Sequence, residues 1–268
     1  MNSLHPLKGP DALKLGVFSA NADGGLAITD VPERWRASWD DNLEAARIAD
    51  RAGLDFLLPI ARWAGFGGKN KVREWSFETF TWAAALAAAT SRIGLFMTVH
   101  VPLVHPLYAA KALATVDHIS HGRAGLNIVC GWNPKEFAMF GIPLSDKGYD
   151  QAAEWLYVIE KAYASDVPFD FDGRYYTLKD VVSRPASVQQ PRPVTMNALS
   201  AGQAAISPPG IAISCSPPSP ISMLPEITSR ISARAPRKSA ATSASTRYAM
   251  SFAARHRPRP TIITSAML

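Results

Sequence analysis

Polar side chains stand near the ends of three apolar runs that are typical of buried strands. Arg62 follows the first of these runs, Thr98 lies at the end of the second, and Asn127 interrupts the third. A guanidinium can hold a phosphate or a carbonyl group. A hydroxyl or an amide at the carboxyl end of a strand can hydrogen-bond a ligand. Asn127 could equally be a core amide satisfied by backbone, and Thr98 an ordinary β-branched strand residue.

The loop after Asn127 adds an aromatic ring and a carboxylate. Trp132 could stack on a planar ligand or cover the end of the sheet. Glu136 could pair with a ligand or act as an acid, although a loop carboxylate is more often solvated. His100 and His105 lie at the same strand ends, but the sequence pattern gives them neither an acid partner nor metal-ligand spacing.

Strands and helices are predicted to alternate around these residues. Short apolar runs predict strands, and amphipathic segments that begin at capping residues predict helices. We expect strands over 13–19, 55–60, 93–99, 124–129 and from 193, and helices over 38–53, 76–90, 106–116 and 149–164. Continuous apolar strands separated by helices are typical of a parallel α/β sheet.

Two architectures fit this alternation, a (β/α)8 barrel and an open doubly wound sheet. The first strand is not followed by the Gly-x-Gly-x-x-Gly of a dinucleotide-binding sheet. Long loops follow the first, second and fourth strands, where barrel enzymes carry their chemistry. The pattern therefore favours the barrel.

Charge and composition divide the chain into two unlike segments. The net charge is +6, but residues 201–268 hold eight of the 28 Lys and Arg and one of the 22 Asp and Glu. That segment is rich in Ser, Ala, Pro and Arg, a composition typical of disorder. Its arginines would suit an electrostatic contact with RNA or a membrane, but it lacks the interleaved aromatic residues that stack on bases. Nucleic acid binding is therefore a weak alternative.

The expected cellular compartment and the expected lack of a metal site rest on sequence signals that are missing. The first residues lack a charged-then-apolar leader, and no apolar run approaches the ~20 residues of a membrane span. Cys130 and Cys215 offer neither a disulfide scaffold nor metal-ligand spacing. We therefore expect a reduced, cytoplasmic protein with no metal site, no membrane contact and no nucleic acid partner.

Residues 116–132, followed by Glu136, resemble the signature of bacterial luciferase-like flavin monooxygenases; their sequence is VDHISHGRAGLNIVCGW. Within that family, residues 64–69 (AGFGGK) and 86–93 (LAAATSRI) are most similar to the pyrimidine monooxygenase branch. Dimethylsulfone and alkanesulfonate monooxygenases are close relatives of that branch. The resemblance runs from about residue 13 to residue 198.

This resemblance implies a (β/α)8 TIM barrel that takes reduced FMN from a separate flavin reductase and adds one oxygen atom from O2 to a substrate. Thr98 and Asn127 match the catalytic positions that frame the flavin edge. Cofactor-binding positions are matched by Ala61, Arg62, Asn127, Glu136, Gly148 and Tyr149, and substrate positions by Trp132 and Glu136. Gly148 replaces the family's usual Arg and would weaken the hold on the phosphate. Arg62 replaces a Lys, which keeps the charge and changes the donor geometry.

The family pattern ends near residue 200. There the family continues with a phosphate loop containing Gly and Ser, whereas this chain reads ISPPGIAIS over 206–214. Codons that encode this stretch can also encode FAARHCDF in a shifted frame, which is close to the helix that follows in the family. We therefore expect a frameshift between about 198 and 206. The chain would then comprise residues 1–198, the first five or so strands of the barrel, and residues 199–268, an irregular, disordered or frameshifted tail.

The predicted function is FMN-dependent, two-component monooxygenation of a small nitrogen- or sulfur-containing compound, either pyrimidine-like or an alkanesulfonate or sulfone. Two alternatives stay open. One is an inactive truncated remnant of such an enzyme, and the other is an oxidoreductase that uses coenzyme F420 on the same barrel. The expected partners are the substrate, O2 and a flavin reductase, and a complete barrel is expected to form a homo-oligomer.

Overall fold

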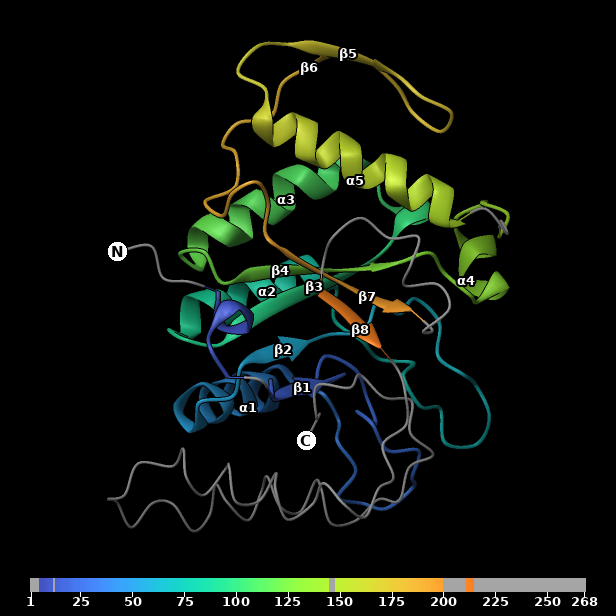
Figure 1. The fold of residues 1–268 in the computed structure, drawn as a ribbon. Helices are drawn as coiled ribbons and strands as arrows, with labels where there is room; N and C mark the ends of the chain where they lie inside the picture. The colour runs from blue at the N-terminus through green and yellow to red at the C-terminus, as the bar shows by residue number, and fades with distance from the viewer. Residues whose placement is uncertain (1–4, 12, 145–147, 200–210, 215–268) are drawn as a thin grey trace.

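The computed structural model describes residues 5–11, 13–144, 148–199 and 211–214. Within them, a six-stranded parallel sheet has the order β1–β2–β3–β4–β7–β8 (Figure 1). Its strands are β1 (Gly16–Phe18), β2 (Phe56–Leu58), β3 (Gly94–His100), β4 (Ala124–Val129), β7 (Val194–Leu199) and β8 (Ile211–Ser214). The parallel pairing confirms the α/β class that the continuous apolar runs predicted.

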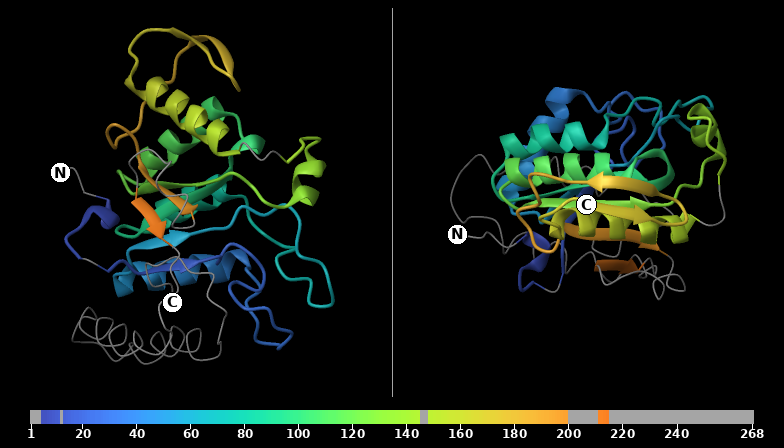
Figure 2. Two further views of the ribbon diagram at one scale, coloured as in Figure 1. Left: turned by 45° about the vertical axis from the view of Figure 1, so that its right-hand side comes forward. Right: turned by 90° about the horizontal axis from the view of Figure 1, so that it is seen from above.

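Between β1 and β7, helices connect the strands of the sheet and cover one of its faces. They are α1 (Trp39–Ala52), α2 (Thr79–Ala89), α3 (Pro106–Ile119), α4 (Pro134–Met139) and α5 (Gly148–Ala164), with short 3-10 turns η1 (Pro6–Lys8) and η2 (Val101–Leu103). Helices α1, α2, α3 and α5 wrap around the outer side of the curved sheet (Figure 1, Figure 2). A strand followed by a helix on the outer side is the repeating unit of a (β/α)8 barrel. None of the helices in the described part of the chain has the length and apolarity that a membrane crossing requires.

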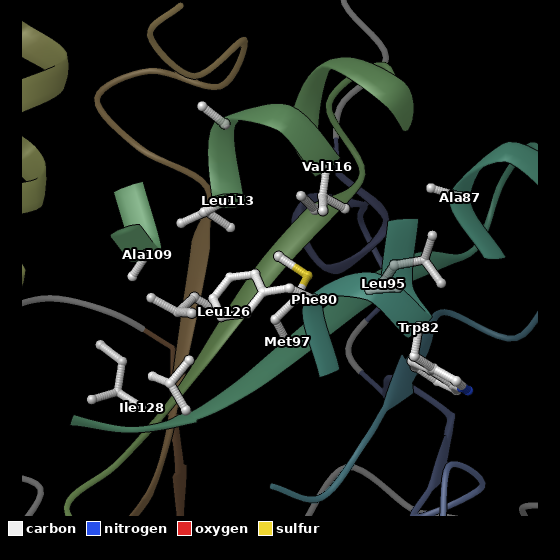
Figure 3. Close-up of a cluster of buried hydrophobic side chains, with 14 of the residues drawn as sticks. Phe80, Trp82, Ala87, Leu95, Met97, Ala109, Leu113, Val116, Leu126 and Ile128 are labelled. Atoms are coloured by element: carbon white, nitrogen blue, oxygen red, sulfur yellow. The ribbon is translucent and has the colours of Figure 1, made fainter. Parts of the chain in front are cut away.

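The main apolar core lies between the sheet and its helices. Figure 3 shows side chains from α2 and α3 packed on β3 and β4: Phe80, Trp82, Ala87, Ala109, Leu113, Val116, Leu95, Met97, Leu126 and Ile128. A second, smaller cluster consists of Phe56, Leu58, Phe96, Val194 and Met196. Successive strand residues point to opposite faces, so this smaller cluster lines the inner face of the sheet. Thr98 and Asn127 belong to that inner face by the same alternation.

Helix ends show where local sequence decides the structure and where it does not. Ser38 Oγ accepts a hydrogen bond from Asp41 N at 3.1 Å, and Gly53 ends α1 in the left-handed conformation, as predicted. The prediction that Ser76 caps α2 is wrong, because α2 begins at Thr79 and Glu78 is its cap. Ser76 Oγ instead donates to the carbonyl oxygen of Arg62 at 2.8 Å.

Two elements differ from the sequence-based expectation. A hairpin of β5 (Phe169–Asp172) and β6 (Thr177–Val181) lies over α5 (Figure 1). Strand β8, which lies inside the segment 199–268, pairs with β7 and extends the sheet beyond the five strands expected. Two of its four residues are isoleucine, a β-branched type that favours strands. The position of the expected frameshift and the rest of the tail lie outside the described residues.

Candidate active site

The predicted site residues gather at the carboxyl ends of β2, β3 and β4. Arg62 follows β2, Thr98 lies near the end of β3, and Asn127 lies near the end of β4. Trp132 and Glu136 come from the loop and the short helix α4 after β4. In a barrel this edge of the sheet is the end that carries binding and catalysis.

Thr98 and Asn127 form a buried hydrogen-bonded pair on adjacent strands. They are opposite each other in the β3–β4 register. Asn127 Nδ2 donates to Thr98 Oγ1 at 3.1 Å, and Thr98 Oγ1 donates to the carbonyl oxygen of Pro59 at 2.5 Å. Both side chains are almost fully buried. Because the donor bond orients the amide, the Asn127 side-chain carbonyl is held in a fixed direction beside the hydroxyl.

Glu136 is buried completely, with an exposed fraction of 0%. Its Oε1 accepts three hydrogen bonds, from Arg62 Nη1 at 3.2 Å, Trp63 N at 3.0 Å and Ala64 N at 3.1 Å. The expectation from spacing that this loop carboxylate is solvated is therefore wrong. The three bonds tie α4 to the loop after β2. Glu136 Oε2 is buried without a hydrogen-bond partner in the part of the chain that the structure describes.

Aromatic rings flank the Arg62 guanidinium. Its Cζ lies 4.9 Å from the centre of the Phe66 ring and 5.0 Å from that of Trp132. Such cation–π contacts gain strength when the charge is shielded from water, and the Arg62 side chain is only 6% exposed. Trp132, which is 55% exposed, thus covers the guanidinium.

Asn21, which sequence reasoning missed, fixes the backbone just before Arg62. Its side chain accepts from Ile60 N at 2.9 Å and donates to the carbonyl oxygens of Ile60 at 2.8 Å and Phe77 at 3.0 Å. Ala61, the next residue along, is half-buried at the rim of the site. A polar residue shortly after the first predicted strand was the signal that could have drawn attention to Asn21.

Gly148 and Tyr149 begin α5 and lie beside Cys130, which follows β4. A Cβ atom placed on Gly148 would come within 2.8 Å of Cys130 Cβ. Burial raises the pKa of Cys130 to about 11, so the thiol is neutral at physiological pH. Burial and the neighbouring Cys130 also raise the pKa of Tyr149. Gly148 and Cys130 are therefore in close contact, and the Cys130 thiol brings no charge to this corner of the site.

His100, the last residue of β3, completes the buried polar set. Its side chain is 4% exposed, and burial lowers its pKa. Sequence reasoning set it aside for want of an acid partner. The fold brings Glu136 close enough to act on its charge, although the two residues are far apart in the sequence.

One cavity among the described residues lies at the opposite end of the sheet. Its volume is about 430 Å³, and Lys14, Asp55 and Arg92 are among its lining residues. These residues precede β1, β2 and β3, so the cavity lies at the amino-terminal ends of the strands. In TIM barrels that end contributes to stability, and the active site lies at the other end. No group of three or more His, Cys, Asp or Glu side chains in the described ranges is arranged to hold a metal ion.

A family model described as luciferase-like monooxygenase matches residues 13–207. The chain belongs to the luciferase-like monooxygenase family. It is 34% identical over 173 residues to the pyrimidine monooxygenase RutA of Caulobacter vibrioides, a match that covers 63% of this chain and 48% of that protein. The chain spans about half the length of the curated relatives it matches.

Solved structures of luciferase-like fold superimpose on the described barrel segment. A crystal structure of riboflavin lyase with modified FMN and riboflavin has a TM-score of 0.61 and 25% identity, covering 70% of this chain and 50% of that chain. An F420-dependent secondary alcohol dehydrogenase has a TM-score of 0.57 at 21% identity, covering 70% and 52%. The second likeness shows the fold alone. Together with the parallel sheet, these matches confirm the luciferase-like TIM-barrel architecture.

The inner face fits the ring end of a flavin. Beside its apolar cluster, at the carboxyl end of the sheet, the Thr98–Asn127 pair offers a hydroxyl and an amide to a ligand. Arg62 Nε is a buried donor without a partner among the described residues, which suits a ligand oxygen. The segment that the family uses for the phosphate, after Ala198, lies outside the described residues apart from Leu199 and β8.

Proposed function

We propose that this protein is the oxygenating component of a two-component, FMN-dependent monooxygenase. Its substrate would be a small nitrogen- or sulfur-containing compound of the pyrimidine, alkanesulfonate or sulfone type. The names of the curated relatives support the pyrimidine class ahead of the alkanesulfonate and sulfone classes. A separate flavin reductase would supply the reduced FMN, and the reaction would take place in the cytoplasm. A complete barrel of this kind would form a homo-oligomer.

The observation that carries this proposal is the Thr98–Asn127 pair on the inner face, at the carboxyl end of the sheet. It combines near-complete burial with a 3.1 Å hydrogen bond between residues of neighbouring strands. Held in this way, the Asn127 carbonyl can accept a hydrogen bond from a ring N–H without reorganising. Reduced FMN, when bound, supplies the electrons that activate O2.

The remaining residues orient the ligand and keep water out. Glu136 holds the loop after β2, so that Ala61 and Arg62 are fixed at the rim. The Arg62 charge, shielded by Phe66 and Trp132, faces away from bulk water and can bind a carbonyl or anionic oxygen. Tyr149 and Gly148 would close the site on the side of the phosphate chain. A dry site prevents unproductive loss of the reactive cofactor state.

Titration of the purified chain with FMN, followed by quenching of flavin fluorescence, tests this assignment. Wild-type protein should bind FMN in its oxidised and reduced forms. Asn127→Ala should weaken binding about tenfold, the value of one hydrogen bond near 1.4 kcal/mol. Thr177→Val, an exposed substitution in β6, is the control and should leave binding unchanged. Equal affinity for wild type and Asn127→Ala would contradict the proposal.

The same titration with coenzyme F420 separates the main alternative, which shares the fold. A chain that binds F420 and not FMN would be a deazaflavin oxidoreductase. A chain that binds neither would be a non-enzymatic remnant of the family. We expect FMN to bind more tightly than F420.

A further inference from the structure

A second arginine, Arg73, lies beside Arg62 in the loop between β2 and α2. Its Cζ atom is 5.2 Å from the centre of the Phe66 ring, and Arg62 Cζ is 4.9 Å from the centre of the same ring. Two hydrogen bonds tie Arg73 to the loop after β1. Its backbone N donates to the carbonyl oxygen of Asp23 at 3.1 Å, and its Nη2 donates to that of Gly25 at 3.4 Å. The two guanidiniums are therefore held as neighbours at the carboxyl end of the sheet.

The positive charges in this region are not balanced equally. Arg62 forms a buried ion pair with Glu136, and Arg34, from the loop after β1, pairs with Asp23 at 2.8 Å. No carboxylate of the described residues forms an ion pair with Arg73, and the charge that acts on it is the like charge of Arg62. Arg73 therefore carries a positive charge that the described part of the chain leaves uncompensated.

The Arg73 side chain also has an unused hydrogen-bond donor. Its Nε atom is buried and lacks a partner within the described ranges, as does that of Arg62. Burial, together with the Arg62 charge, lowers the pKa of Arg73, although an arginine stays charged at physiological pH. Buried donors in native proteins are nearly always paired, and a buried charge is costly without a partner. Both properties are explained by a ligand that brings an acceptor and a negative charge.

The backbone of Arg73 is consistent with a role of its side chain. Its φ is 63°, in the left-handed region that glycine and asparagine adopt more readily than a long side chain does. Residues held in this conformation cluster at binding sites, where the surrounding structure stabilises them. Here two hydrogen bonds from Arg73 to the neighbouring loop hold the residue in place.

We propose that Arg73 determines specificity by binding an anionic group of a ligand, a carboxylate, sulfonate or phosphate, beside the position of Arg62. The planar guanidinium matches the oxygens of such groups. The favoured source is the substrate, because the exposed rings of Phe66 and Trp132 flank the same site and can stack on a planar compound. The other source is the phosphate of the cofactor.

The substrate class rests on the proposed function and makes it narrower. An uncompensated cation favours an acidic compound over a neutral one of the same shape. The expected substrate is thus a sulfonate rather than a sulfone, or a pyrimidine that carries an acidic substituent.

Methanesulfonate and dimethyl sulfone test the anionic preference on the full chain without cofactor, because they are similar in shape and only the first is charged. Calorimetry should show that wild-type protein binds methanesulfonate about tenfold more tightly than dimethyl sulfone. Arg73→Gln should remove this preference, and Arg73→Lys, which keeps the charge, should retain most of it. No preference in wild-type protein would overturn the proposal, and that result needs no variant to fold. The same preference in Arg73→Gln as in wild type would overturn it as well.

Lys71→Gln is the matched control for Arg73→Gln. Lys71 is an exposed cation of the same loop, and its φ of 47° is also positive. The substitution therefore removes one positive charge at a residue of similar backbone conformation. It should leave the preference for methanesulfonate unchanged. An equal effect of the two substitutions would mean that only the overall charge of the loop matters, and would contradict a site at Arg73.

Two further ligand pairs distinguish the sources of the anionic group. With FMN-loaded protein, Arg73→Gln should weaken binding of orotate about tenfold and leave binding of uracil, which lacks the carboxylate, unchanged. Weaker binding of FMN with unchanged binding of riboflavin, which lacks the phosphate, would support the anion site and assign it to the cofactor. An equal loss for orotate and uracil would mean that Arg73 only holds the loop, and would overturn the proposal. A chain that prefers methanesulfonate through Arg73 and binds no FMN would contradict the proposed function and leave this inference standing.

Discussion

Glu136 and Arg62 form a buried ion pair across the mouth of the sheet, with 3.2 Å between Oε1 and Nη1 and side-chain exposures of 0% and 6%. The pair joins α4 to the loop after β2. Two backbone donors, Trp63 N and Ala64 N, share the same carboxylate oxygen. The pair therefore shapes the rim on which the proposed cofactor site depends.

Replacing one partner of this ion pair should lower the free energy of unfolding. Glu136→Gln leaves the Arg62 charge buried and unpaired, and we expect a loss of about 3 kcal/mol in the free energy of unfolding. Urea denaturation measures this. Asp170→Asn removes an exposed partner of Lys179 and should leave the urea midpoint unchanged. Equal midpoints for wild type and Glu136→Gln would contradict a stabilising role of the pair.

The contact between Gly148 and Cys130 makes a second prediction. Gly148→Ala places a Cβ atom 2.8 Å from Cys130 Cβ, closer than such atoms normally approach. We expect a loss of about 1–3 kcal/mol from this overpacking, despite the better helix propensity of Ala. In a Cys130→Gly background the clash disappears, and the same substitution should become stabilising. Additive effects in this double-mutant cycle would show that the two residues do not interact.

Burial of His5 should make the stability of the protein depend on pH under acidic conditions. Burial, assisted by Lys8, lowers its pKa from 6.5 to about 3. Between these values the unfolded chain binds a proton that the folded chain does not. The contribution of His5 is therefore complete above pH 6.5 and falls by about 1.4 kcal/mol per pH unit on acidification.

The check is the urea midpoint measured between pH 7 and pH 4. His5→Asn keeps an acceptor for Leu7 N and should reduce the dependence on pH. His121→Asn is the control, since His121 is exposed and its φ of 54° is one that Asn tolerates. The pH dependence of the control should match that of wild type. The same dependence in His5→Asn would show that His5 does not titrate in this way.

The parallel α/β class could be predicted from sequence, because continuous apolar strands separated by helices are typical of it, whereas these runs alone fitted both a barrel and an open doubly wound sheet. The hairpin β5–β6 was missed, although the alternation of Phe and Asp over 169–172 was a signal for a half-exposed strand. Its location over α5 depends on contacts between distant segments, such as the Tyr157 and Phe171 rings at 5.7 Å.

The residues of the site could be predicted from sequence better than the contacts between them. Thr98 and Asn127 could be singled out as polar residues in apolar strands, and their roles at a flavin remain predictions. Burial of Glu136 could not be predicted, because its three donors come from a loop more than 70 residues away in sequence.

Incorporation of oxygen from ¹⁸O2 tests the central claim most directly. The chain would be incubated with FMN, a flavin reductase, NADH and ¹⁸O2, with uracil, an alkanesulfonate and a sulfone offered in turn. Mass spectrometry should find one ¹⁸O atom in the product of one substrate class, and Asn127→Ala should greatly reduce its yield. Protein that binds reduced FMN yet transfers no ¹⁸O to any of the three classes would contradict the account.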